Sequence, residues 1–135
     1  MLLLEDEPVV ALELEAFLRE LGAEVVVSAG ATETALRVAL ATPLDAALLD
    51  IQIGTGLGGI DLARQLKTLG IAVIFVTGFA AALEDQAEMR GLHPYALFTK
   101  PYQPRALART LHRLARERGR RLGGAGAEDR PPPAG

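Results

Sequence analysis

The feature that most constrains this chain is a regular alternation of short apolar runs with segments of helical spacing. The runs lie at 2–4, 25–27, 45–50, 71–76 and 95–99. Runs this short, bounded by glycine, proline and charged residues, are typical of strands that are buried on both faces. The sequence therefore predicts five strands of a parallel sheet.

Helical segments fill the gaps between these strands. Their apolar residues recur at i, i+3 or i+4 and i+7, and Gly22 and Gly70 stand where helix C-caps belong. The expected helices run from Pro8 to Leu21, over 31–41, from Ile60 to a stop at Gly70, over 80–91, and from Pro104 through Leu114. The helix over 80–91 has the weakest pattern, and residues 54–59 are expected to form a glycine-rich loop.

This order of elements predicts an α/β fold. Strict alternation of strand and helix implies a parallel sheet with helices on both faces. Five strands of this length indicate a flavodoxin-like doubly wound sheet, (βα)5, with strand order 2-1-3-4-5. The first and third strands are neighbours in that order, so the carboxylates of Glu5, Asp6 and Asp50 should meet at the carboxyl edge of the sheet.

Composition excludes several classes of protein. Half of the 135 residues are hydrophobic, which is enough for one compact domain, expected over residues 1–118. The segment 119–135, rich in Gly, Arg, Ala and Pro, is expected to be disordered. The absence of cysteine excludes disulfides and zinc-thiolate sites.

Hydropathy and charge indicate where in the cell the protein is expected and which classes of binding partner are not expected. No apolar run approaches the roughly 18 residues of a membrane span, and no secretory signal precedes the first strand, so a cytoplasmic protein without a membrane partner is expected. The first 115 residues carry more acidic than basic side chains. Nucleic acid is therefore not an expected partner.

The acidic cluster suggests phosphoryl chemistry. Adjacent carboxylates repel one another, which raises a pKa or recruits a cation, and hard oxygen ligands without His or Cys favour Mg²⁺. Once a metal neutralises the charge, Asp50 could act as a nucleophile toward phosphorus. Thr77 and Lys100, which end the fourth and fifth strands, would offer a hydroxyl and an ammonium group to the phosphoryl oxygens.

Four short motifs at successive strand ends together resemble the receiver domain of two-component response regulators. They are Leu4-Glu5-Asp6-Glu7-Pro8, Leu48-Leu49-Asp50, Val76-Thr77-Gly78 and Thr99-Lys100-Pro101. The resemblance covers about residues 1–118. It implies a phosphoprotein that works in phosphorelay signal transduction.

The resemblance also implies a role for each site residue. Asp50 would accept a phosphoryl group from a histidine kinase or a histidine phosphotransfer protein and become an aspartyl phosphate. Thr77 and Lys100 would hold the phosphoryl oxygens, with the Lys100–Pro101 peptide in the cis form. The implied Mg²⁺ ligands are Asp6 and Asp50 directly, Glu5 through water, and Gln52 through its backbone carbonyl.

A receiver is not an enzyme beyond promoting its own phosphorylation and dephosphorylation. The residues after the last helix are too few for an output domain, so the receiver is expected to stand alone and to signal through contact with an unknown downstream protein. In this family the face made by the fourth helix, fifth strand and fifth helix changes its binding on phosphorylation. The same face is a candidate for homodimer formation.

The chain departs from the usual receiver pattern in places. Leu97 stands where most receivers carry the aromatic residue that reports phosphorylation. The segment Ile74–Phe79 resembles the Phe-Ala-Thr-Gly motif of a subgroup that lacks this aromatic, although Val76 replaces the alanine. The stretch 59–64 looks more like ordinary receivers, so both assignments stay open. Tyr102 is assigned to packing alone.

Other functions fit parts of the same sequence. Leu97 and the glycine-rich loop favour, as the main alternative, a degenerate receiver that binds proteins without being phosphorylated. A dinucleotide site is disfavoured because the G-x-G-x-x-G match over 54–59 is not followed by an acid at the next strand end. A haloacid-dehalogenase-type phosphohydrolase would need an aspartate where Gln52 stands.

Overall fold

The five predicted strands form one parallel sheet. The structure, a computed structural model, describes residues 1–5, 7–24, 27–29, 32–51, 56–78 and 91–119. The strands are β1 (Leu2–Leu4), β2 (Val27–Ala29), β3 (Ala46–Ile51), β4 (Ala72–Thr77) and β5 (Ala96–Thr99). Their order is β2-β1-β3-β4-β5 and every neighbouring pair is parallel, as predicted.

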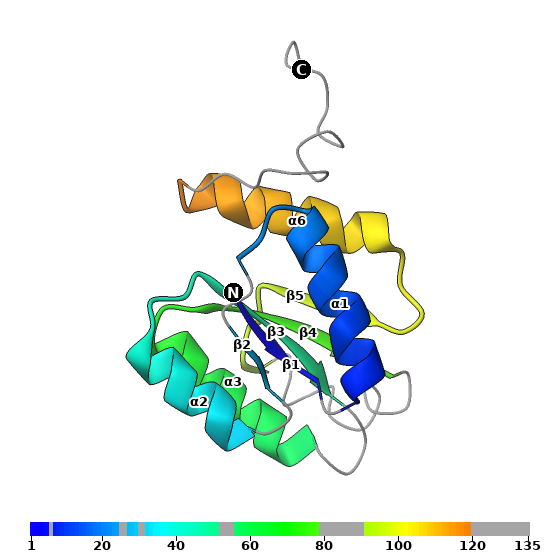
Figure 1. Cartoon of the computed structure of the whole chain (residues 1–135). Coiled ribbons are helices and arrows are strands. Elements are labelled where there is room, and N and C mark those ends of the chain that lie inside the picture. Colours follow the sequence, from blue (N-terminus) through cyan, green and yellow to red (C-terminus); the bar gives the residue numbers. More distant parts are fainter. Residues whose placement is uncertain (6, 25–26, 30–31, 52–55, 79–90, 120–135) are drawn as a thin grey trace.

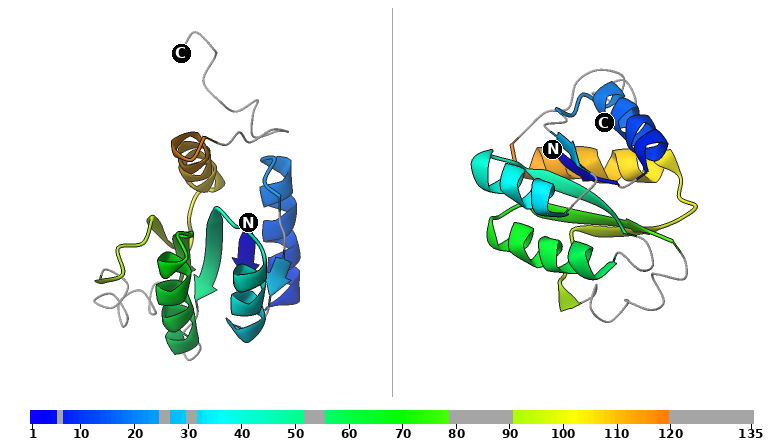
Figure 2. Two further views of the ribbon diagram at one scale, coloured as in Figure 1. Left: turned by 90° about the vertical axis from the view of Figure 1, so that its left-hand side faces the viewer. Right: turned by 60° about the horizontal axis from the view of Figure 1, so that its bottom comes forward.

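Helices cover both faces of the sheet (Figures 1 and 2). Those within the described ranges are α1 (Pro8–Glu20), α2 (Thr32–Ala41), α3 (Gly56–Thr68) and α6 (Pro104–Glu117). The right-hand view of Figure 2 shows α1 and α6 on one side of the sheet and α2 and α3 on the other. None of the helices in the described part of the chain is long and apolar enough to cross a membrane.

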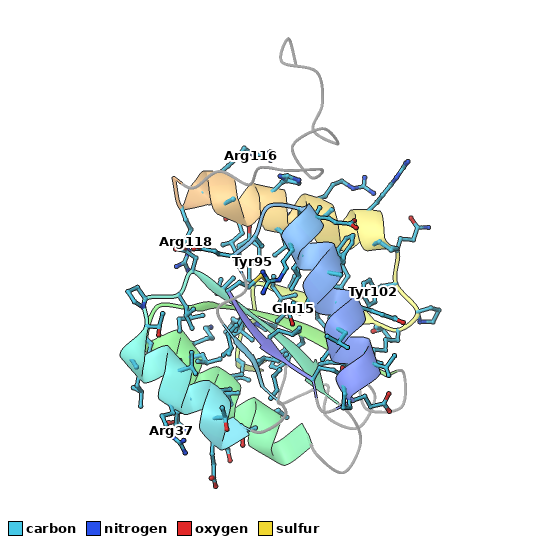
Figure 3. The ribbon with its side chains drawn as sticks, viewed as in Figure 1. Glu15, Arg37, Tyr95, Tyr102, Arg116 and Arg118 are labelled. Carbon is cyan, nitrogen blue, oxygen red and sulfur yellow. The ribbon has the colours of Figure 1, made fainter. Side chains whose placement is uncertain are left out.

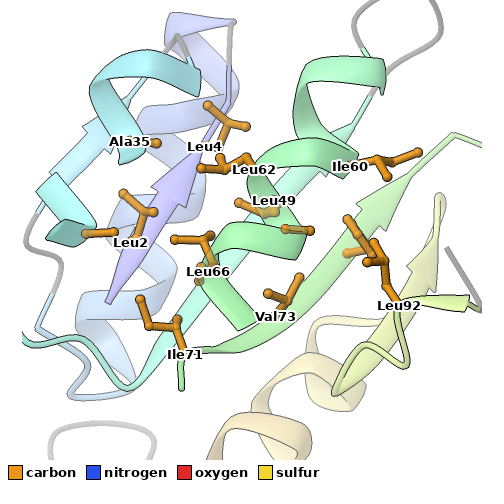
Figure 4. Close-up of a cluster of buried hydrophobic side chains, with 14 residues drawn as sticks. Leu2, Leu4, Ala35, Leu49, Ile60, Leu62, Leu66, Ile71, Val73 and Leu92 are labelled. Atoms are coloured by element: carbon orange, nitrogen blue, oxygen red, sulfur yellow. The ribbon is translucent and has the colours of Figure 1, made fainter. Parts of the chain in front are cut away.

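The strands bury side chains on both faces because successive residues point in opposite directions. Along β4, Val73 and Phe75 enter the core beneath α2 and α3, whereas Ile74 and Val76 enter the core beneath α1 and α6. Figure 4 shows the first of these clusters, in which Leu49 of β3 packs with Leu62 and Leu66 of α3. The continuous apolar runs are thus explained by a sheet that is covered on both sides.

Proline and glycine set the helix limits as the sequence predicts. Pro8 and Pro104 occupy the first turns of α1 and α6, where a missing N–H costs no hydrogen bond. Gly22 and Gly70 have φ of 92° and 81°. That left-handed backbone ends a helix with little strain only at glycine.

Two predicted boundaries are wrong in the structure. The second strand, predicted over 25–27, continues to Ala29, because its pairing with β1 extends to Leu4, which lies opposite Ala29. Residues 25 and 26 lie outside the described residues, as do residues 79–90, which hold almost all of the expected helix over 80–91.

The expected loop over 54–59 is also wrong over its last four residues. Helix α3 begins at Gly56, so Gly56–Gly59 form its first turn. Glycine costs about 1 kcal/mol relative to alanine within a helix. Packing of the buried Ile60, Ala63 and Leu66 offsets this cost. Residues 54 and 55, and the expected disordered residues 120–135, lie outside the described residues.

Candidate functional site

The strand register brings the predicted acids together at the carboxyl edge of the sheet. The pairing of β1 with β3 ends with Leu4 opposite Leu49, and the next residues on these strands are Glu5 and Asp50. Both residues are buried, Glu5 with 3% and Asp50 with 6% of its surface exposed. Asp6 and Gln52, the other expected ligands, lie outside the described residues.

Thr77 and Lys100 reach the same edge from the next two strands. Thr77 pairs with Ile51 of β3 on one side and Thr99 of β5 on the other. The backbone N–H of Lys100 donates to the Thr77 carbonyl at 2.8 Å, so the β4–β5 ladder extends by one more step. The Lys100–Pro101 peptide is cis, as the family resemblance implied.

Asp50 and Lys100 form an ion pair. Lys100 Nζ lies 2.7 Å from Asp50 Oδ2, and the Asp50 side chain has no exposed surface. Burial alone would lower the pKa of Lys100. The hydrogen bond to Asp50 and the charges of Asp50 and Glu5 outweigh that effect and raise the pKa above its ordinary value. The lysine is therefore a fixed positive charge beside the buried carboxylate.

The hydroxyl of Thr77 is available for a new hydrogen bond. Thr77 is completely buried, and its Oγ1 donates to the Gly78 carbonyl only at a long 3.4 Å. A Cβ placed on Gly78 would meet no atom within 4 Å in the described part of the chain, so there is open space beside this strand end. The hydroxyl can turn to a group that enters this space.

The residues present fit a hard divalent cation. Asp50 Oδ1 is buried without a hydrogen-bond partner among the described residues, and the second buried carboxylate, Glu5, is its neighbour across the strands. Mg²⁺ prefers such oxygen ligands and needs only one or two protein carboxylates. The described residues alone contain no cluster of three or more His, Cys, Asp or Glu, and Asp6, the third acid of the expected set, lies outside them.

A hollow leads to the buried Asp50. Its volume is about 310 Å³, and it lies between α1 and the segment that joins β5 to α6. The lining is largely apolar and consists of Val10, Glu13, Leu14, Phe17, Asp50, Lys100, Tyr102 and Pro104. Both partners of the ion pair therefore lie at the wall of this hollow.

Tyr102 belongs to the site, although the sequence assigned it to packing. It lines the hollow and is labelled beside α1 in Figure 3, and its ring centroid lies 5.7 Å from that of Phe98. Burial, followed by the negative charge of Asp50, raises its pKa above the ordinary value. Its position two residues after Lys100, in the same short connection, is the one signal that could have indicated this.

The position of the usual aromatic switch is different here. Leu97 lies on the edge strand β5 and is 39% exposed. Tyr95 lies close by in the sequence, but its hydroxyl is bound to α6. It donates to Glu117 Oε1 at 2.8 Å and accepts from Arg113 Nε at 3.0 Å. The two residues thus have separate surroundings.

Comparisons with known proteins show the family of this chain. The family model described as the response regulator receiver domain matches residues 1–112. The phyllosphere-induced regulator PhyR of Methylorubrum extorquens is 34% identical over 105 residues, which cover 76% of this chain and 38% of that protein. The chain thus spans well under half the length of this curated relative.

Solved structures show the same fold. The signal receiver domain of a modulated diguanylate cyclase from Desulfovibrio desulfuricans superposes with a TM-score of 0.76 and 26% identity, covering 87% of this chain and 94% of that one. A CheY-like response regulator receiver domain protein from Methanospirillum hungatei gives a TM-score of 0.75 and 25% identity, with the same coverages.

Proposed function

The chain belongs to the response regulator receiver family, and on that premise we propose that Asp50 accepts a phosphoryl group from a phosphohistidine. The donor would be a histidine kinase or a histidine phosphotransfer protein. The bond between phosphorus and the donor nitrogen breaks as the bond to an Asp50 carboxylate oxygen forms. The product is an aspartyl phosphate at Asp50, within the proposed receiver domain of residues 1–118.

One observation carries this proposal. Asp50 has a fully buried side chain with one oxygen held by Lys100, while the other oxygen has no hydrogen-bond partner among the described residues. A carboxylate that served only stability would be expected to have both oxygens satisfied. Oδ1 has lone pairs free to bind a metal or to attack phosphorus.

The neighbouring residues have complementary roles. Lys100, as a fixed cation, binds one phosphoryl oxygen. Its bond to Asp50 weakens as the negative charge passes from the carboxylate to the phosphoryl group. The Thr77 hydroxyl donates a hydrogen bond to a second phosphoryl oxygen. Glu5, Asp6, Asp50 and the carbonyl of Gln52 would hold Mg²⁺, which supplies charge neutralisation for the transferring group. The hollow beside Tyr102 admits the donor imidazole.

The signal would leave by protein contact. Phosphorylation adds about −1.5 to −2 charges, and the exposed Leu97 lies on β5, next to the site. A downstream protein, or a second copy of the chain, would bind the face around β5 and α6 with a changed affinity once Asp50 is phosphorylated. The chain needs no reaction on any outside substrate for this role.

Intact-mass spectrometry tests the proposal directly. The chain is incubated with acetyl phosphate and Mg²⁺, and one phosphate is expected on the wild type and none on Asp50→Asn. Asp61→Asn is the matched control, because Asp61 is an exposed carboxylate on α3 that pairs with Arg64. No added phosphate on wild type would favour the degenerate receiver, a protein-binding module that works without phosphorylation.

A further inference from the structure

A second hollow lies at the opposite edge of the sheet from Asp50. It holds about 590 Å³ between the C-terminal ends of α2, α3 and α6. Its wall includes Leu40 and Leu69, which are 66% and 45% exposed and are thus large apolar side chains left open to water. Apolar side chains gathered in one hollow are typical of an interaction site. We call this hollow the amino-edge groove.

The chain leaves α6 at the rim of the amino-edge groove. Arg118 lines the groove, and its Nη1 donates to the Gly70 carbonyl at 2.8 Å, which fixes the end of α6 against the end of α3. Figure 3 shows Arg118 beside the connection between α2 and β3. Gly119 then turns the chain with φ of 68°. The residues that follow therefore start within reach of the groove.

We propose that Leu122 docks into the amino-edge groove against Leu40 and Leu69. Within residues 120–135, Leu122 is the only Leu, Ile, Val, Met or aromatic residue. Three residues beyond Gly119 can span up to about 10 Å, which suits a site whose rim is Arg118. The proposal is independent of phosphorylation at Asp50.

Tethering favours this occupant over a second copy. Leu122 lies only four residues after Arg118, which itself lines the groove. A short covalent connection gives an effective concentration in the millimolar range. A single apolar side chain held at such a concentration can occupy a groove for which it would have little affinity as a free group.

Disulfide trapping tests the proposal, because the chain contains no cysteine of its own. The pair Thr42→Cys and Gly123→Cys places one thiol in the groove wall and one beside Leu122, and leaves Leu40, Leu69 and Leu122 intact. Under mild oxidation we expect a disulfide within one chain. Adding Leu122→Ser should slow its formation about tenfold, because serine cannot pack against the apolar side chains of Leu40 and Leu69.

Two results would overturn the proposal. An equal rate with Leu122→Ser would mean that the segment merely passes the groove, and a disulfide that links two chains would mean that a second copy occupies it. Leu40→Asp added to the cysteine pair gives an independent check, since it charges the groove wall without touching the segment, and it should slow trapping to a similar extent. Circular dichroism of each variant confirms that it is folded.

Discussion

Lys100 Nζ lies 2.7 Å from Asp50 Oδ2, and the pair joins a carboxylate side chain with no exposed surface to an ammonium group that is 36% exposed. The two partners are therefore unequal, because water can still solvate the lysine but cannot reach the aspartate. Removing the lysine leaves a buried charge, whereas removing the charge of the aspartate leaves a solvated cation.

Lys100→Met should destabilise the fold by about 1–3 kcal/mol, because a buried acceptor is left unpaired. Asp50→Asn should stay within about 1 kcal/mol of the wild type or exceed its stability, since the buried charge is gone. Urea unfolding without Mg²⁺ measures both. If Lys100→Met unfolds at the wild-type urea concentration, the ion pair does not stabilise the fold.

Mg²⁺ should stabilise the folded chain, because the proposed ligands come together only after folding. At a concentration ten times its Kd, a ligand that binds only the folded state adds about 1.4 kcal/mol. The Tm should therefore rise with Mg²⁺ for the wild type and for Asp61→Asn, the surface control. A similar rise in Asp50→Asn would argue against a metal at this edge of the sheet.

Thr77 should contribute its hydroxyl to phosphoryl transfer without contributing much to stability. Thr77→Val keeps the shape of this fully buried side chain and removes only a hydroxyl whose hydrogen bond is 3.4 Å long. We expect phosphorylation by acetyl phosphate to slow about 10- to 100-fold, the value of one hydrogen bond to a charged group. Thr77→Ser keeps the hydroxyl and should stay within a fewfold of the wild-type rate.

The central site could be predicted from sequence because strand order alone decides it. Once β1 and β3 are neighbours, Glu5 and Asp50 must lie side by side, and the ends of β4 and β5 must bring Thr77 and Lys100 to the same edge. These relationships need only short apolar runs and the connection rules of parallel sheets. They do not depend on side-chain detail.

The structural features that the sequence did not predict depend on local geometry. The start of α3 at Gly56 depends on how well the rest of that helix packs, which no glycine pattern reveals. The role of Tyr102 depends on the path of a short irregular connection with no periodicity. The bonding of the Tyr95 hydroxyl to α6 depends on which way one side chain turns.

Tyr102 should ionise late in an alkaline titration. Burial and the charge of Asp50 raise its pKa above 10.0 in the folded chain. The folded state therefore holds the phenol proton more tightly than the unfolded state does, so this stabilisation is present below pH 10 and is lost as pH rises through the folded-state pKa.

Absorbance of tyrosinate near 295 nm, measured on the wild type and on Tyr102→Phe, isolates the signal of this side chain. Asp50→Asn should move that signal to lower pH, because it removes a negative charge that opposes ionisation. An unmoved titration would mean that the charge of Asp50 does not reach the Tyr102 hydroxyl.

Tyr95 should matter for stability rather than for signalling. Its ring packs against buried residues beneath α6, its hydroxyl joins Arg113 and Glu117, and the Arg113 guanidinium carbon lies 5.1 Å from the ring centroid. Tyr95→Ala should therefore cost about 2 kcal/mol through lost packing. Tyr95→Phe removes only exposed hydrogen bonds and should cost less than about 1 kcal/mol.

Phosphorylation of Asp50 by acetyl phosphate should be unchanged in both Tyr95 variants, because the hydroxyl is bound to α6 and not to the phosphoryl-accepting edge. Urea unfolding and intact mass, measured on the same samples, separate the two effects. If Tyr95→Ala instead keeps wild-type stability but loses binding of a downstream protein, Tyr95 is the residue that reports phosphorylation. Leu97 cannot take that role in the usual way, because it has no aromatic ring.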